Sequence, residues 1–235
     1  MRRHADKKTP VALHAQRLPI HKCLCFVLVQ GGLLSPSQTG RKMMQTARER
    51  WYNSRLRHGV FFAVLVPVEL RPKIATCFAE FQTQYPFRDR MISPQRLHLS
   101  LNPVFAGECL PDRVVRFSQR VGASIRFEQF EICLDKALTY RNRQSQKPFV
   151  LASSTCSKSV NGLVDHIAEA LASLSGTKAK VCRPISPHVT LIWDEVSVPE
   201  CLIDPITLPV REVSLVHSHI GQSRYDILGN WPLVG

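Results

Sequence analysis

The tetrapeptide HLSL at residues 98–101 recurs in altered form as HVTL at residues 188–191. Each copy lies within an apolar run that is typical of a β-strand. Side chains two residues apart on a strand point to the same face, so each copy presents an imidazole beside a hydroxyl. With nine histidines in the chain, chance gives on the order of 0.1 matches to such a pattern. Two matches therefore indicate a site that two strands build together.

This pair of motifs suits in-line displacement at a phosphodiester. One neutral imidazole takes a proton from the attacking oxygen, and the other, as imidazolium, gives a proton to the leaving oxygen. The hydroxyls hydrogen-bond the non-bridging oxygens. We therefore predict that His98 and His188 are catalytic, that Ser100 and Thr190 bind substrate, and that no metal or other cofactor is required. The alternative is that each histidine is a structural residue at a strand end.

The sequence around both motifs resembles that of the two-histidine (2H) phosphoesterases, and within them the RNA 2',3'-cyclic phosphodiesterases historically called 2'-5' RNA ligases. Residues 60–67 are similar to the opening strand of that family, and residues 186–191 match its second motif with the usual preceding proline. Residues 210–233 follow its closing pattern in order. The resemblance extends from about residue 59 to the end of the chain.

The resemblance implies a reaction and a role for each motif residue. The expected activity is the opening of a 2',3'-cyclic phosphate at an RNA end, which leaves a 2'-phosphate. His98 is then the general acid to the 3' leaving oxygen, and His188 is the general base for water. Two other interpretations stay open. One is a phosphodiesterase acting on 2'-5' linked oligonucleotides or nucleotide cyclic phosphates, and the other is a non-catalytic module that binds nucleotides or RNA.

The chain departs from the family pattern just after the second motif. Many members carry an arginine there that holds the substrate phosphate, whereas residues 192–194 are Ile-Trp-Asp. Another cation must then supply the charge. We expect Arg141, Arg143 and Arg224 to bind substrate, with Arg183 and Lys147 as further candidates.

Hydrophobic periodicity predicts an α+β protein. The fold class we expect is two pseudo-symmetric lobes, each an antiparallel sheet with outer helices, around a central cleft. Helices are expected over residues 69–84, 112–121 and 160–174. Strands are expected over residues 60–66, 97–102, 149–151 and 188–193, near 211–219 and 224–229, and as one long or two short strands between 125 and 138.

The net charge of +13 is unevenly distributed. Residues 1–57 carry 12 Lys and Arg against 2 Asp and Glu, a net +10, which leaves 19 against 16, a net +3, for the rest. We interpret residues 1–57 as a basic extension, disordered or partly helical, and residues 58–235 as the catalytic domain. A transit peptide or an RNA-contacting arm would also suit the charge of the extension. The mildly basic domain favours RNA ends over a long duplex as partner, and a monomer is expected.

The remaining features set the expected compartment and the alternatives for metal binding. The eight cysteines show no zinc-ligand spacing, which favours reduced thiols and a cytoplasmic location. The apolar run over residues 23–29 is too short to span a bilayer, so no membrane contact is expected. His217 and His219 lie two apart on an expected strand, but two imidazoles without a neighbouring carboxylate or thiolate are weak grounds for a metal site.

Overall fold

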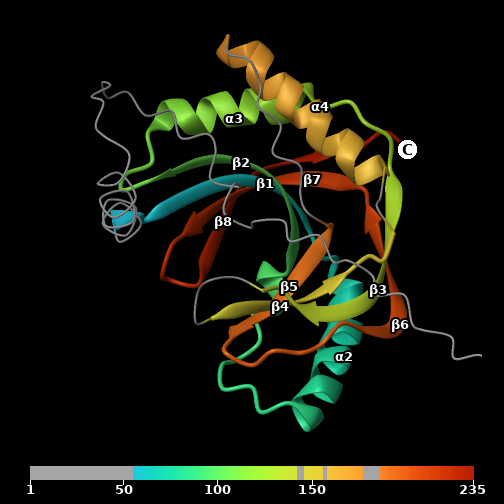
Figure 1. The fold of residues 1–235 in the computed structure, drawn as a ribbon. Coiled ribbons are helices and arrows are strands. Elements are labelled where there is room, and N and C mark those ends of the chain that lie inside the picture. Colours follow the sequence, from blue (N-terminus) through green and yellow to red (C-terminus); the bar gives the residue numbers. More distant parts are fainter. Residues whose placement is uncertain (1–54, 142–145, 156–157, 177–185) are drawn as a thin grey trace, which may run out of the picture.

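In a computed structural model of the chain, the described residues are 55–141, 146–155, 158–176 and 186–235 (Figure 1). The strands are β1 His58–Leu65, β2 His98–Gly107, β3 Phe130–Thr139, β4 Lys147–Ala152, β5 His188–Asp194, β6 Cys201–Val210, β7 Glu212–His219 and β8 Arg224–Pro232. The helices are α2 Arg71–Gln84, α3 Asp112–Ser124 and α4 Lys158–Ser175, with short 3-10 turns η2 Val68–Leu70 and η3 Pro94–Arg96.

The strands form one sheet in the order β6-β3-β4-β5-β2-β1-β7-β8, and neighbouring strands are antiparallel. The order divides into two half-sheets, β6-β3-β4-β5 and β2-β1-β7-β8, which meet where β2 pairs with β5. That pairing involves one residue from each strand, Leu99 and Val189. The α+β class and the two antiparallel lobes are thus confirmed, and the structure adds that the lobes join edge to edge at this seam.

Helices α3 and α4 lie over the half-sheet β2-β1-β7-β8, and helix α2 lies over the half-sheet β6-β3-β4-β5 (Figure 1). Helix α3 packs on β7 and β8, where its Gly122 lets the Trp231 ring approach closely. Helix α4 lies beside α3, and its Val164 carbonyl accepts a hydrogen bond from Asn102 of β2 at 3.1 Å. Helix α2 follows β1 in the chain but packs on the other half-sheet, where Phe81 meets Phe149 of β4 at 4.9 Å between ring centroids.

One face of strand β1 packs in the core, and its other face lies on the side of the sheet that carries the motif histidines. Its Val60, Phe62 and Val64 are buried at 2% exposure or less, whereas Phe61 and Leu65 are half-buried on the opposite face. The alternation is that expected of a strand with one face in the core. Because cross-strand partners share a face, this pattern also assigns a face to the residues of β2 and β7 that pair with β1.

Strand β6 was missed by the sequence analysis. It contains Pro205 and Pro209, which lack an N–H for the ladder and argue against a central strand. The structure places β6 at one edge of the sheet, where only β3 pairs with it. The expected strand between residues 125 and 138 also begins later, at Phe130, because residues 127–129 bond to Val234 near the chain end instead.

The interpretation of residues 1–57 as an extension lies largely outside the described residues. Arg57 already takes part in the sheet, since its N–H donates to the Gly107 carbonyl at 3.0 Å and its carbonyl accepts from Ile220 at 2.9 Å. None of the helices in the described ranges combines the length and apolar character of a membrane span. The cysteines in those ranges are free thiols, namely Cys77, Cys109, Cys133 and Cys201.

Candidate active site at the seam between the half-sheets

The two motifs meet where the half-sheets join. Leu99 and Val189 pair there, and both side chains are buried at 1% exposure or less. Because successive side chains alternate between faces, the residues flanking this pair point to the opposite face of the sheet. The antiparallel register sets each histidine across from the hydroxyl residue of the other motif. The residues brought to this one face are His98, Ser100, His188 and Thr190.

Both imidazoles are held by the same kind of hydrogen bond. Nδ1 of His98 lies 2.7 Å from the carbonyl oxygen of Arg96, and Nδ1 of His188 lies 2.7 Å from that of Ser186. A carbonyl oxygen can only accept, so each Nδ1 carries a proton and donates it. Each neutral ring therefore has its lone pair on Nε2. The two motifs thus share a carbonyl two residues before the histidine as the group that orients the ring.

The electrostatics of the site favour neutral imidazoles. Burial lowers the pKa of both His98 and His188 below the ordinary value, although the accepting carbonyls oppose the shift. Positive charge on His188 and on Arg96 lowers the pKa of His98 further. The two histidines are therefore close enough for the charge of one to disfavour protonation of the other. A positive charge on both imidazoles at once is therefore disfavoured.

Aromatic rings flank both histidines. Phe61 and Tyr225 lie against His98, with ring centroids 5.2 and 5.6 Å away. Tyr140 meets His188 edge-on at 5.1 Å. These rings pack against the two imidazoles in addition to the hydrogen bonds at Nδ1. Tyr225 comes from β8, and no local sequence pattern places it beside a histidine of β2.

Arg96 is a functional candidate that the sequence analysis did not name. It ends the turn η3, two residues before His98, and its guanidinium carbon lies 4.6 Å from the centre of the Tyr225 ring. Its Nε is buried and has no hydrogen-bond partner among the described residues. A buried donor without a partner is costly, so it suits an anion that binds there. The signal that could have found it is its position two residues before the first motif histidine.

The cations that the sequence analysis did name lie in different places. Arg141 is exposed and follows Tyr140 at the end of β3. Arg224 directs its guanidinium to Asp226, at 3.0 Å from Nε to Oδ1 and 3.2 Å from Nη2 to Oδ2. Lys147 donates to Ser197 Oγ at 2.9 Å. Arg143 and Arg183 lie outside the described residues.

Asp194 explains part of the departure after the second motif. Its carboxylate is buried and accepts hydrogen bonds from the N–H groups of Arg88, Asp89 and Val196, at 2.8, 3.0 and 2.9 Å. The segment before η3 is thereby held to the end of β5. Asp194 is thus a structural residue.

Comparisons with known proteins show what the fold is similar to. E. coli LigT in apo form superposes with a TM-score of 0.57, is 24% identical, and is matched over 77% of this chain and 99% of that chain. TT0787 of Thermus thermophilus gives a TM-score of 0.60 at 21% identity, over 74% of this chain and 97% of that chain. A protein described as a phosphoesterase gives a TM-score of 0.56 at 24% identity, over 76% of this chain and 99% of that chain. Neither a protein-family model nor a curated protein sequence matches this chain. The chain therefore has the LigT fold.

LigT has been crystallised with several phosphate-containing ligands. Its solved structures include complexes with ATP, with 3'-AMP and with phosphate, at 21%, 23% and 22% identity to this chain. These structures have TM-scores of 0.56, 0.56 and 0.55. They establish the same fold as the apo form does.

Proposed function

We propose that this protein hydrolyses a 2',3'-cyclic phosphate at an RNA end to a 2'-phosphate, by acid and base catalysis from His98 and His188. The observation that carries the proposal is the matched pair of hydrogen bonds from Nδ1 to a backbone carbonyl at 2.7 Å, which leaves both Nε2 atoms for the substrate. The LigT fold, and the phosphate and 3'-AMP complexes of LigT itself, also support a phosphoester substrate.

Each histidine has a separate step in the reaction. Nε2 of His188 takes a proton from water as the water oxygen bonds to phosphorus. The bond from phosphorus to O3' breaks, and Nε2–H of protonated His98 gives its proton to O3'. The products are a 2'-phosphomonoester and a free 3'-hydroxyl, and the pair of histidines ends with the same number of protons. His98 and His188 are diagonal neighbours across the antiparallel pair of β2 and β5. Such neighbours lie roughly 7–8 Å apart, a span that holds one phosphate.

The groups around the histidines hold the phosphate. The Ser100 and Thr190 hydroxyls have no hydrogen-bond partner among the described residues, so both can donate to non-bridging oxygens. Arg96 takes the place of the arginine that is absent after the second motif. Its buried Nε has no hydrogen-bond partner among the described residues, and its positive charge lowers the pKa of His98. Hydrogen bonds from a fixed cation to a developing charge stabilise a transition state strongly in a dry site.

The test is direct hydrolysis of a short oligonucleotide that ends in a 2',3'-cyclic phosphate, in the presence of EDTA. We expect turnover by the full chain, with the product identified as a 2'-phosphate by phosphorus NMR. The matched control is His166→Gln, because His166 lies on α4, outside the site, and accepts a hydrogen bond from the Arg126 N–H at 3.3 Å. Absence of turnover in wild-type protein, with a 2'-5' linked oligonucleotide cleaved instead, would overturn the proposed substrate.

A further inference from the structure

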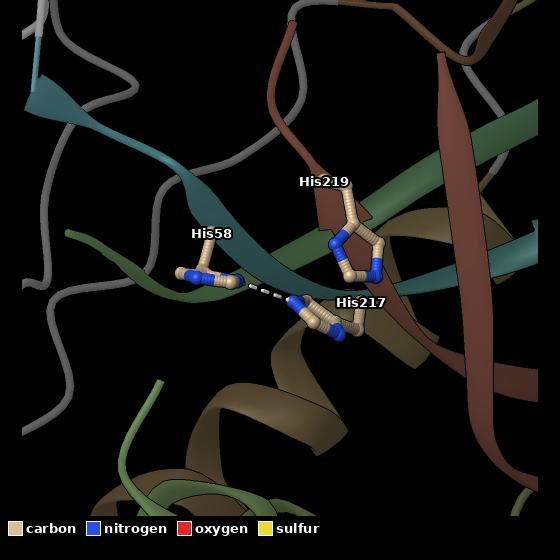
Figure 2. Close-up of side chains that lie close together, drawn as sticks. All are labelled: His58, His217 and His219. Carbon is tan, nitrogen blue, oxygen red and sulfur yellow. Dashed lines mark hydrogen bonds between the residues drawn. The ribbon is translucent and has the colours of Figure 1, made fainter. Parts of the chain in front are cut away.

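Three histidines gather at the other end of β1, away from the motifs (Figure 2). His58 begins β1, and it pairs with His219 of β7. His217 lies two residues before His219, and its Nε2 is 2.9 Å from Nδ1 of His58. One ring nitrogen from each of the three residues lies within 4.8 Å of the others. His217 is buried and the other two are half-buried.

A carboxylate lies behind two of these imidazoles. Oδ2 of Asp226, on β8, is 2.6 Å from Nε2 of His219 and 3.8 Å from Nδ1 of His217. These contacts leave Nδ1 of His219 for another ligand, while Nε2 of His217 is in a hydrogen bond with Nδ1 of His58 that an ion bound by both nitrogens would replace. An imidazole whose second nitrogen faces a carboxylate is the usual arrangement of a metal-binding histidine, because the carboxylate fixes the ring and its tautomer. Arg224 holds Asp226 from its other side, at 3.0 Å.

We propose that His58, His217 and His219 bind a divalent transition-metal ion of the zinc type, with Asp226 orienting His219 through a hydrogen bond. Bonds of about 2.0–2.1 Å to a tetrahedral ion place ligand nitrogens roughly 3.3 Å apart. The observed spacing, from 2.9 Å to within 4.8 Å, brackets that value. Neutral imidazole suits zinc, copper, nickel and iron, whereas magnesium and calcium take oxygen ligands.

The register sets this site on the opposite face from the motifs. His58 shares the face of Val60 and Phe62, whereas His98 pairs with Leu65 on the other face of β1. Seven residues of strand, roughly 23 Å at about 3.3 Å per residue, separate His58 from Leu65. The metal therefore takes no part in the phosphodiester chemistry. Its role is to fix the start of β1 to the hairpin of β7 and β8.

Local sequence pattern reveals only part of this cluster. His217 and His219 lie two residues apart, but no third histidine lies near them in the sequence. His58 lies 159 residues before His217 and reaches it only through the pairing of β1 with β7. Asp226 reaches His217 through the pairing of β7 with β8. A metal site assembled by sheet register leaves no local spacing signal.

The test is titration of the metal-free full chain with Co²⁺ and with Zn²⁺. We expect the wild-type protein to bind one more equivalent than His217→Gln or His58→Gln, and Co²⁺ in that equivalent to show a tetrahedral spectrum without thiolate charge transfer. His166→Gln serves as the control and should bind like wild type. Asp226→Asn should weaken binding by roughly 10–100-fold.

Thermal unfolding provides an independent measurement. Zn²⁺ should raise the midpoint of wild type and of His166→Gln, and leave that of His58→Gln and His217→Gln unchanged, because a ligand stabilises only the state that binds it. Equal stoichiometry and affinity in wild type and both folded ligand variants would overturn the proposal. Hydrolysis in EDTA is a separate result, so failure of the metal site and failure of the proposed function are distinguishable.

Discussion

At the scale of single residues, the partner of each imidazole determines its chemistry. A backbone carbonyl on Nδ1 of His98 and His188 fixes the tautomer without adding a net charge, and burial lowers the pKa of both rings. A carboxylate beside His219 instead adds negative charge, which suits a cation. In the two proposals, the same residue type serves proton transfer on one face of the sheet and metal binding on the other.

Removing either motif histidine should abolish most turnover. Each proton transfer contributes typically ~10²–10⁴ in rate, so His98→Gln and His188→Gln should each lower kcat by at least ~10² while the fold survives. Ser100→Ala and Thr190→Val should cost ~10–10², since a hydrogen bond to a charged oxygen contributes about 1.5–3 kcal/mol. The measurement is kcat on the cyclic-phosphate oligonucleotide, with circular dichroism as the check on folding. Full activity in either histidine variant would refute the assignment.

Arg96 should matter more than the exposed Arg141. Loss of a charge-assisted hydrogen bond to phosphate costs about 1.5–3 kcal/mol, so Arg96→Gln should lower kcat/KM by roughly 10–100-fold. Arg141→Gln is the matched control and should change kcat/KM by less than about threefold, as is usual for a solvated surface charge. Steady-state kinetics on a dinucleotide cyclic phosphate separate the two. The reverse order of effects would move the phosphate site toward the end of β3.

The pH dependence follows from the lowered pKa values of both histidines. The general acid His98 must be protonated, and its pKa in the free protein lies below the ordinary value of about 6.5. Therefore kcat/KM should rise as the pH falls from about 8 toward about 6, and fall again once His188 is protonated. The alkaline limb should move to higher pH in Arg96→Gln, because a positive charge that lowers the pKa of His98 is removed. An unchanged limb in that variant would contradict the placement of Arg96.

At the scale of elements, local pattern predicted most of the fold and little of its assembly. Periodicity located α2, both motif strands and the α+β class. It missed β6, whose prolines are tolerated only because the strand is at an edge. It also could not show that α2 packs on the half-sheet that does not contain β1. Arg96, Tyr225 and His58 gain their neighbours through turns and strand register, which leave no signal in local spacing.

The contact between α3 and β8 should be sensitive to a single methyl group. A Cβ on Gly122 would lie 2.4 Å from the Trp231 ring, whereas a Cβ on Gly162 of α4 would lie 3.2 Å from Phe127. Both glycines are helical, so alanine gains about 1 kcal/mol of helix propensity at either position. Gly122→Ala should therefore be less stable than Gly162→Ala by about 1–3 kcal/mol, the usual cost of overpacking. Urea unfolding measures the difference, and equal midpoints would mean that Trp231 moves freely.

At the scale of the whole molecule, charge and chemistry lie in different parts of the chain. Residues 1–57 carry a net +10 of the total +13, whereas both motifs lie beyond residue 97. The seam between the half-sheets pairs β2 with β5, and the groups proposed to bind phosphate lie at residues 96–190. We therefore expect the basic segment to be separable from catalysis, and its charge would favour the binding of longer RNA.

A chain that begins at Met44 tests this separation. It should cleave a dinucleotide cyclic phosphate at the wild-type rate, because the sheet begins with Arg57 and His58. If the removed segment contacts RNA, affinity for longer strands should fall, and the dependence of log affinity on log salt should become less steep because fewer counterions are released. If it does not, both chains should show the same slope in fluorescence-anisotropy titrations over a range of salt concentrations. Loss of activity on the dinucleotide would instead show that residues before 44 pack against the domain, so the dinucleotide assay decides the boundary and the salt slope decides the role.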